Sequence, residues 1–260
     1  MKKRLTKNNK SIEKMFHIIE AMAEYKGPMR LLDISSSVQY PNTTVLRMLN
    51  SLMSCGYVYQ EAATIKYTLS LKFIKIGEAV RSQFGIRDIV RPFLVELSDR
   101  CQETACLAID DNRMVVYIDA IEGADKILRT LQRIGKSAPM HSTGVGKLLL
   151  LNYDTEQLKE YVDKKGLVKL TKNTITDRNK LHTELKKIQK LGYALDNEEC
   201  EEGAKCIAAP IRDYTGKIIA CISVSGPTSR ISSDRINKII DIILDISSKI
   251  SAQLGYNKNV

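Results

Sequence analysis

Residues 40–58 read YPNTTVLRMLNSLMSCGYV and combine an apolar stripe with a polar side. Spacing typical of a helix predicts a buried face made of Val45, Leu49, Leu52 and Met53. Turn-forming residues bound the segment, so we expect Asn42 or Thr43 to cap the helix and Gly56 to end it. The opposite face carries four polar side chains, which are Thr43, Thr44, Arg47 and Asn50.

The flanking sequence supplies the other elements of a small domain. A helix with Ser11 as its expected N-cap has one apolar face, made of Ile12, Met15, Phe16, Ile19 and Met22. A short second helix is expected around residues 31–37. Alternating residues over 57–60 and 66–69 predict a β-hairpin, with its tip between them.

Residues 11–70 therefore predict a winged helix-turn-helix, with residues 40–58 supplying its third helix. A helix fits the major groove of DNA, and its first residues reach base edges and phosphates. The polar face would then meet DNA. The alternative is an ordinary helical subdomain whose polar face is solvated.

Composition favours a globular chain with a polyanionic partner. The 260 residues are 43% hydrophobic and 27% charged, and the formal net charge is +10. Residues 1–80 carry 12 basic and 6 acidic side chains, whereas residues 81–260 carry 28 and 24. The N-terminal third is therefore the expected nucleic-acid binder. Residues 1–10, MKKRLTKNNK, form either a flexible cationic arm or a solvated terminus without a role.

No apolar run approaches the ~20 residues of a membrane helix, and the N-terminus lacks the apolar segment of a secretory signal. We therefore expect a soluble, cytoplasmic protein. Residues 71–84 predict a linker helix and residues 85–260 an α+β domain with a mostly antiparallel sheet. Its helices are expected at 87–100 (interrupted near Pro92), 143–152, 155–163, 177–191 and 233–254. Its strands are expected at 104–109, 113–119, 127–133, 205–211 and 217–225.

Several separated motifs resemble the IclR family of bacterial transcription regulators along nearly the whole chain. They are SIEKMFHIIEAMAE, PNTTVLRMLNSLMSCGYV, YTLSLKFIKIG, PMHSTGVGKLLL, NTITD, GYALDNEECEEGAKCIAAPI and IACISVSGP. Tyr40 stands where the family usually has Gly, and Asn42 where it usually has Lys. The resemblance implies a homodimer or dimer of dimers on a partly palindromic operator, with a GAF/profilin-like effector domain. The residues predicted to bind DNA are Arg30, Asn42, Thr43, Thr44, Arg47 and Asn50.

The resemblance also implies effector contacts. In relatives that bind glyoxylate or pyruvate, the contacts correspond to Gly144, Val145, Asp196, Cys206, Ser223 and Ser225. Free N–H groups at the helix start could hold a carboxylate, and two serines two apart on a strand share one face. An ionised Asp196 would require a ligand with a hydrogen-bond donor. We therefore expect a small keto-, hydroxy- or sugar-acid effector and a repressor, with no cofactor.

Two other readings stay open at this point. Asp196 with Cys206 could form an enzyme site for small acids, although no partner histidine is evident. The six cysteines form no C-x-x-C pair, so free buried thiols are expected, but a thiol- or metal-sensing repressor is the remaining alternative. GVGK at 144–147 is not a phosphate-binding loop, because His141 occupies the place of its first glycine.

Overall fold

The computed structural model describes residues 9–25, 27–83, 85–123 and 134–257. The chain divides into two compact units, residues 1–84 and residues 85–260. Within the described ranges, no helix is long and apolar enough to cross a membrane. Most of the predicted basic arm and the strand predicted at 127–133 lie outside the described residues.

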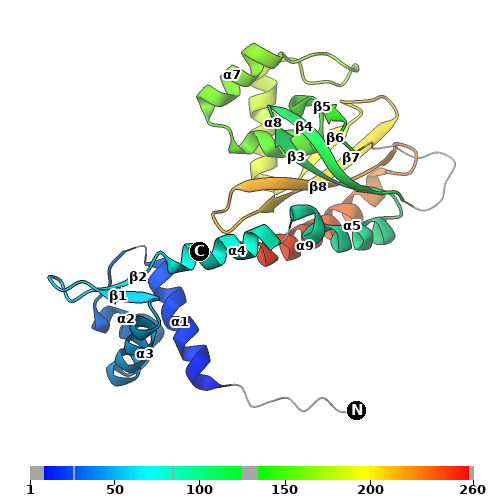
Figure 1. The fold of residues 1–260 in the computed structure, drawn as a ribbon. Helices are drawn as coiled ribbons and strands as arrows, with labels where there is room; N and C mark the ends of the chain where they lie inside the picture. The colour runs from blue at the N-terminus through cyan, green and yellow to red at the C-terminus, as the bar shows by residue number, and fades with distance from the viewer. Residues whose placement is uncertain (1–8, 26, 84, 124–133, 258–260) are drawn as a thin grey trace, which may run out of the picture. The chain divides into compact units, whose positions relative to one another are not determined.

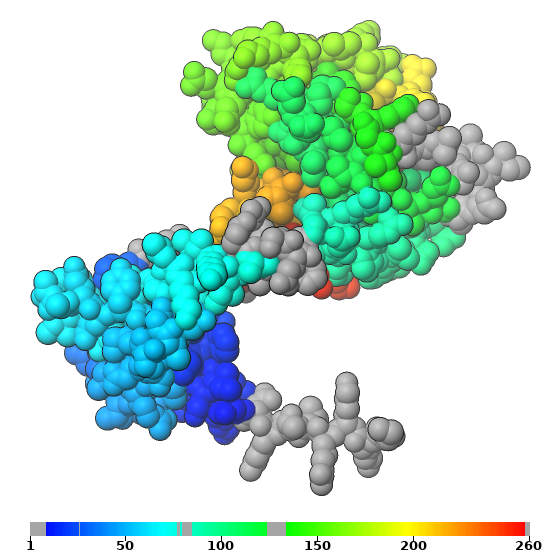
Figure 2. Space-filling model, viewed as in Figure 1, coloured from blue at the N-terminus to red at the C-terminus, as the bar shows by residue number. Residues whose placement is uncertain are grey.

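The first unit is the predicted winged helix-turn-helix (Figure 1). Its elements are α1 (Lys10–Glu24), α2 (Leu31–Val38), α3 (Asn42–Ser54), β1 (Val58–Gln60), β2 (Tyr67–Leu69) and α4 (Lys72–Gln83). The two strands pair antiparallel, and the loop between them projects beyond the helices. In the space-filling view this hairpin is the cyan lobe beside the blue surface of α2 and α3 (Figure 2).

The core of this unit confirms the predicted stripe of α3 and changes that of α1. Val45, Leu49 and Leu52 are buried together with Met48, whereas Met53 is only half-buried. On α1 the core residues are Ile18 and Met22. Two members of the predicted α1 face are instead largely exposed, Ile12 at 53% and Phe16 at 57%.

Both predicted helix caps in this unit are wrong. Asn9, not Ser11, caps α1, because its side chain accepts the Ser11 N–H at 3.1 Å. Pro41 precedes α3, and no side chain caps the helix, so Asn42 and Thr43 are already helical. The Pro41 carbonyl accepts the N–H groups of Thr44 and Val45.

The second unit is built on a six-stranded antiparallel sheet with the order β5-β4-β3-β8-β7-β6. The strands are β3 (Thr104–Asp111), β4 (Met114–Ile121), β5 (Ser137–Ala138), β6 (Ala194–Asn197), β7 (Ala204–Arg212) and β8 (Ile218–Pro227). Helices α5 (Ile86–Cys101) and α9 (Ser233–Gln253) cover one face (Figure 1). The other face is covered by 3₁₀ turns η1 (Met140–Ser142) and η2 (Leu150–Asn152) with α6 (Gly144–Leu149), α7 (Thr155–Lys165) and α8 (Arg178–Leu191).

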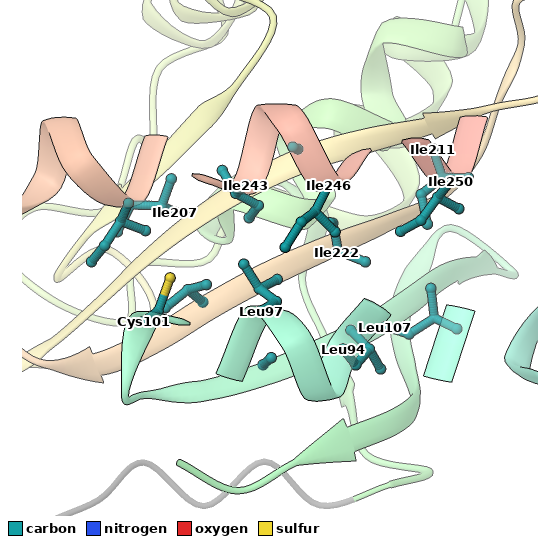
Figure 3. Packing of buried hydrophobic residues seen from close by; sticks show 14 of the residues in the cluster. Leu94, Leu97, Cys101, Leu107, Ile207, Ile211, Ile222, Ile243, Ile246 and Ile250 are labelled. Atoms are coloured by element: carbon teal, nitrogen blue, oxygen red, sulfur yellow. The ribbon is translucent and has the colours of Figure 1, made fainter. Parts of the chain in front are cut away.

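Figure 3 shows how α5 and α9 bury one face of the sheet. Leucines of α5 and isoleucines of α9 point toward Leu107 of β3 and Ile222 of β8. The predicted interruption near Pro92 is wrong, since α5 is continuous across it. Pro92 faces solvent, where water can satisfy the freed carbonyl, while Leu94 and Leu97 are fully buried.

Candidate functional site

The predicted DNA-binding residues lie on the surface of the first unit. Asn42, Thr43, Arg47 and Asn50 are exposed on α3, and Thr44 is half-buried. Arg30 is exposed as well, but it lies one element away, at the start of α2. Within the described residues neither arginine has an ion-pair partner. Because no side chain caps α3, its first N–H groups can meet an acceptor from outside the protein.

Tyr40 fixes the turn that precedes α3. Its hydroxyl is 2.6 Å from Nδ1 of His17 on α1, and the Lys14 ammonium lies 5.1 Å from the centre of its ring. At the other end of α3, the Lys72 ammonium donates to the carbonyl of Cys55 at 2.7 Å. Both ends of α3 are thus tied to other helices by polar contacts.

The predicted effector residues of the sheet lie on one face, in two cross-strand rows. The register places Ser223 of β8 opposite Cys106 and Ala208, and Ser225 opposite Thr104 and Cys206. Asp196 of β6 lies opposite Cys206 and so extends the second row. Because directly paired residues in an antiparallel sheet point to the same side, these rows form one polar floor. Cys106 and Ala208 belong to the core under α6, which shows that the floor faces this helix.

Helix α6 begins directly over this floor. A Cβ at Gly144 would lie 3.3 Å from the Ala208 Cβ, and one at Gly146 would lie 2.3 Å from the Met140 Cα. Glycine at these places lets the backbone approach the sheet and η1. The side chain of Thr143 caps the helix by accepting the Gly146 N–H at 3.0 Å. The helix has six residues rather than the ten predicted, so its dipole is small and local N–H groups matter more.

Asp196 is buried and held by backbone donors. Its Oδ1 accepts the N–H groups of Glu199 at 2.8 Å and Cys200 at 3.3 Å. Burial raises the pKa of Asp196 to about 7, and the nearby Glu199 carboxylate adds to the rise against the effect of these donors. The ligand therefore need not supply a hydrogen-bond donor to Asp196, because this carboxyl can itself carry a proton near neutral pH.

All six predicted effector residues are buried. The Ser223 hydroxyl has no nitrogen or oxygen partner within the described part of the chain, and its polar neighbours include the thiols of Cys106 and Cys206. A surface cleft of about 360 Å³, lined by residues such as Asp110, Tyr153 and Lys217, holds none of the six. The six residues are thus shielded from solvent in this conformation.

Two further residues near the floor were not expected from the sequence. Lys147 of α6 is fully buried, and its ammonium lies 2.6 Å from Oε1 of Glu199. Lys147 lies in GVGK and Glu199 in DNEE, two of the motifs that resemble the family, and this position was the only sign in the sequence that could have pointed to them. Their pairing across 52 positions had no signature in the sequence.

Neither catalytic nor metal chemistry is supported by the side chains around the floor. Burial raises the pKa of Cys206 to about 12 and that of Cys200 to about 11, so both are poor nucleophiles. His141, the nearest candidate base in the sequence, is bound to Tyr161 and to the carbonyl of Val168. Its pKa is lowered by burial. The described residues hold no group of three potential metal ligands, and the six cysteines are free thiols.

A winged helix-turn-helix joined to a separate α+β unit defines a two-part regulator of transcription. Two family models match: the IclR helix-turn-helix domain over residues 11–62, and the C-terminal domain of bacterial transcriptional regulator IclR over residues 78–252. The chain therefore belongs to the IclR family of DNA-binding transcriptional regulators and is not an enzyme.

Two transcriptional regulators are similar in sequence to this chain over nearly its full length. The HTH-type transcriptional regulator KdgR of Escherichia coli K12 is 34% identical over 247 residues, covering 95% of this chain and 93% of KdgR. The HTH-type transcriptional repressor AllR of the same strain is 30% identical over 249 residues, covering 96% and 92%.

Solved structures show the same fold. The crystal structure of Thermotoga maritima IclR has a TM-score of 0.61 with 32% identity, covering 95% of this chain and 99% of that one. An IclR-type regulator from Silicibacter sp. TM1040 has a TM-score of 0.85 at 18% identity, covering 95% and 96%.

Proposed function

We propose that the chain is a repressor whose operator affinity is controlled by a small keto-, hydroxy- or sugar acid. Residues 11–70 would bind the operator, residues 71–84 would form the linker, and residues 85–260 would bind the effector. The observation that carries the proposal is the polar floor under α6, where Ser223 holds a buried hydroxyl with no nitrogen or oxygen partner. The thiols of Cys106 and Cys206 beside it are weak hydrogen-bond partners, so a ligand oxygen would satisfy the Ser223 hydroxyl better.

Operator binding would use the exposed face of α3. Thr43, Arg47 and Asn50 can reach base edges in the major groove, while the uncapped start of the helix faces phosphates. The hairpin loop would contact the flanking backbone. The net positive charge of residues 1–80 supports this assignment, because phosphate neutralisation dominates affinity for DNA.

Arg47→Ala tests the DNA-binding face. We expect operator affinity to fall by about 5- to 150-fold, the cost of about 1–3 kcal/mol that removing an arginine contact to DNA carries. The unfolding temperature should not change, since Arg47 is exposed. The matched control is Arg178→Ala, which removes the same charge from the second unit. A gel-shift titration in which both variants bind like the parent protein would contradict the proposal.

Effector binding would use both the floor and the start of α6. The N–H groups of Gly144 and Val145 would face the ligand's carboxylate, and a protonated Asp196 could donate to it. Because the six residues are buried, the ligand enters only if α6 or the turn after β6 moves from the sheet. That movement offers a route by which binding changes the protein's conformation, and couplings of this kind are typically ~1–3 kcal/mol.

Ser223→Ala combined with Ser225→Ala tests the effector site. We expect the double variant to bind the operator like the parent protein but to lose its response to the acid, because two hydroxyls leave the floor. Isothermal titration and gel shift with the acid found by a thermal-shift screen provide the measurements. Ser248→Ala, an exposed serine of α9, is the control. An undiminished heat of binding would count against this site.

A second copy of the chain is the proposed partner of the first unit. Large apolar side chains are exposed on α1 and α4, among them Phe16 at 57% and Ile74 at 65%. Isolated exposed apolar residues are common, but here they recur on two helices of a small domain. A homodimer would bury them and present two DNA-reading helices to the halves of a palindromic operator.

A further inference from the structure

Glu199 is a buried carboxylate with one oxygen in use and one without a partner. The residue is 7% exposed, and its Oε1 lies 2.6 Å from the Lys147 ammonium. Its Oε2 is buried and has no hydrogen-bond partner within the described residues. A buried charged oxygen left in this state costs free energy that the protein would regain by giving it a donor.

The backbone around Glu199 is fixed next to the effector site. The Glu199 N–H donates to Oδ1 of Asp196 at 2.8 Å. Two threonines of the α7–α8 loop hold the same turn, since the Thr171 hydroxyl donates to the Glu198 carbonyl at 2.6 Å and the Thr174 hydroxyl to the Glu199 carbonyl at 2.7 Å. Lys147 comes from α6, one turn after Gly144. Glu199 thus joins the two elements that the proposed function assigns to the effector.

The chemistry of the free oxygen restricts what it can accept. An ionised carboxylate is an acceptor only, so it favours a ligand O–H and disfavours a second carboxylate or a keto oxygen. Burial raises the pKa of Glu199, and the Lys147 ammonium and the Asn197 backbone N–H oppose that rise. The contact of 2.6 Å between the Lys147 ammonium and Oε1 favours the ionised carboxylate. With Lys147 occupied by Oε1, Oε2 remains for the ligand.

We propose that Glu199 is a specificity-determining residue that accepts a hydrogen bond from a hydroxyl of the effector, so that the effector is an acid carrying at least one hydroxyl group. This inference rests on the proposed function of the same site. The competing role for Glu199 is structural, in which it only balances the charge of Lys147. The two roles differ in one respect: a structural role has no preference among ligands.

The experiment compares acids that differ by hydroxyl groups. Propionate, lactate, glycerate and gluconate are titrated calorimetrically into the full-length protein, Glu199→Gln and the control Glu202→Gln, which changes an exposed neighbour. In Glu199→Gln the amide oxygen faces Lys147, so an N–H₂ donor replaces the free acceptor. The double variant Lys147→Met with Glu199→Gln removes both charges of the buried pair and gives the same comparison if the single variant is unstable.

We expect the parent protein and Glu202→Gln to bind the best hydroxylated acid about tenfold or more tightly than propionate, as a charge-assisted hydrogen bond would give. In Glu199→Gln and the double variant this ratio should fall by about tenfold. An unchanged ratio with uniformly weaker binding would assign Glu199 a structural role and overturn the inference. Equal binding of all four acids by the parent protein would overturn it too. No binding of any of the four acids by the parent protein would overturn both the inference and the proposed acid effector.

Discussion

At the scale of single residues, Asp196 has the property with the clearest measurable consequence. Its carboxyl is buried beneath α6, and burial raises its pKa from 3.8 to about 7. Near neutral pH the same group is a donor in part of the molecules and an acceptor in the rest. A site with such a group suits ligands that carry both a carboxylate and a hydroxyl.

The stability of the protein should therefore depend on pH through Asp196. A carboxyl whose pKa is raised on folding contributes stability that is fully present below pH 3.8 and is lost as pH rises through about 7. Asp196→Asn removes this dependence. The free energy of unfolding of the variant, relative to that of the parent protein, should rise by about 1–4 kcal/mol between pH 4.5 and pH 8. Urea unfolding at both pH values measures the difference, and a constant difference would contradict the assignment.

The family resemblance predicted some residues of the candidate effector site and missed others. Asp196, Ser223 and Ser225 were predicted because they stand in motifs that resemble the family's. Whether they lie together depends on strand register, which the structure supplies. The Lys147–Glu199 pair joins positions 52 apart, and a single sequence has no periodicity that reports such a contact.

At the scale of elements, the contact between α1 and the turn before α3 depends on the side chain of Tyr40. Glycine, which the family resemblance leads one to expect at this position, would have no side chain to contact His17. The tyrosine replaces that gap with a hydrogen bond of 2.6 Å and a nearby Lys14 ammonium. We infer that Tyr40 restricts the motion of α3 relative to α1.

Tyr40→Phe removes only the hydroxyl and should loosen this contact. We expect a loss of about 1 kcal/mol, seen as roughly fivefold faster amide hydrogen exchange in α1, because a partly exposed hydrogen bond contributes about this much. Tyr59→Phe, on the exposed side of β1, should leave the exchange of α1 unchanged. Equal protection of α1 in all three proteins would show that the hydrogen bond does not hold the helix.

Long periodic elements were predicted well and short ones poorly. The predicted helix at 177–191 corresponds to α8, and the strands predicted at 205–211 and 217–225 correspond to β7 and β8. No strand was predicted at β6, because four residues containing Asp196 and Asn197 have little strand character alone. They become a strand by pairing with β7. Tertiary packing likewise decided α5, where burial against the sheet outweighed the cost of Pro92.

At the scale of the whole molecule, the chain keeps DNA recognition and the proposed ligand recognition in separate units. Two routes by which a signal can pass between them are the chain that joins them and contacts between copies. The exposed apolar residues of α1 and α4 make the second route physically plausible, since a dimer contact would lie in the same unit as the DNA-binding helix.

Phe16→Glu and Ile74→Glu test the dimer directly. Each places a charge at a site proposed to be buried between copies, so we expect the dimer dissociation constant to rise at least about 100-fold. Sedimentation velocity measures the change, and operator affinity should fall with it. Leu170→Glu, at an exposed leucine of the second unit, is the control. A dimer that survives both substitutions would place the interface elsewhere.

The ladder of paired strands beneath α6 also bears on how such regulators could diversify. Backbone hydrogen bonds, not side chains, hold Ser225, Cys206 and Asp196 in one cross-strand row. A shift of one residue in β8 would turn its serines to the opposite side of the sheet, into the hydrophobic core that the sheet shares with α5 and α9. Insertions that alter this register would therefore disrupt the site, whereas the turns over the sheet can change in sequence without doing so. New ligand preferences would then arise by exchange of residues such as Glu199 in the turn after β6, while the paired strands β6, β7 and β8 stay the same.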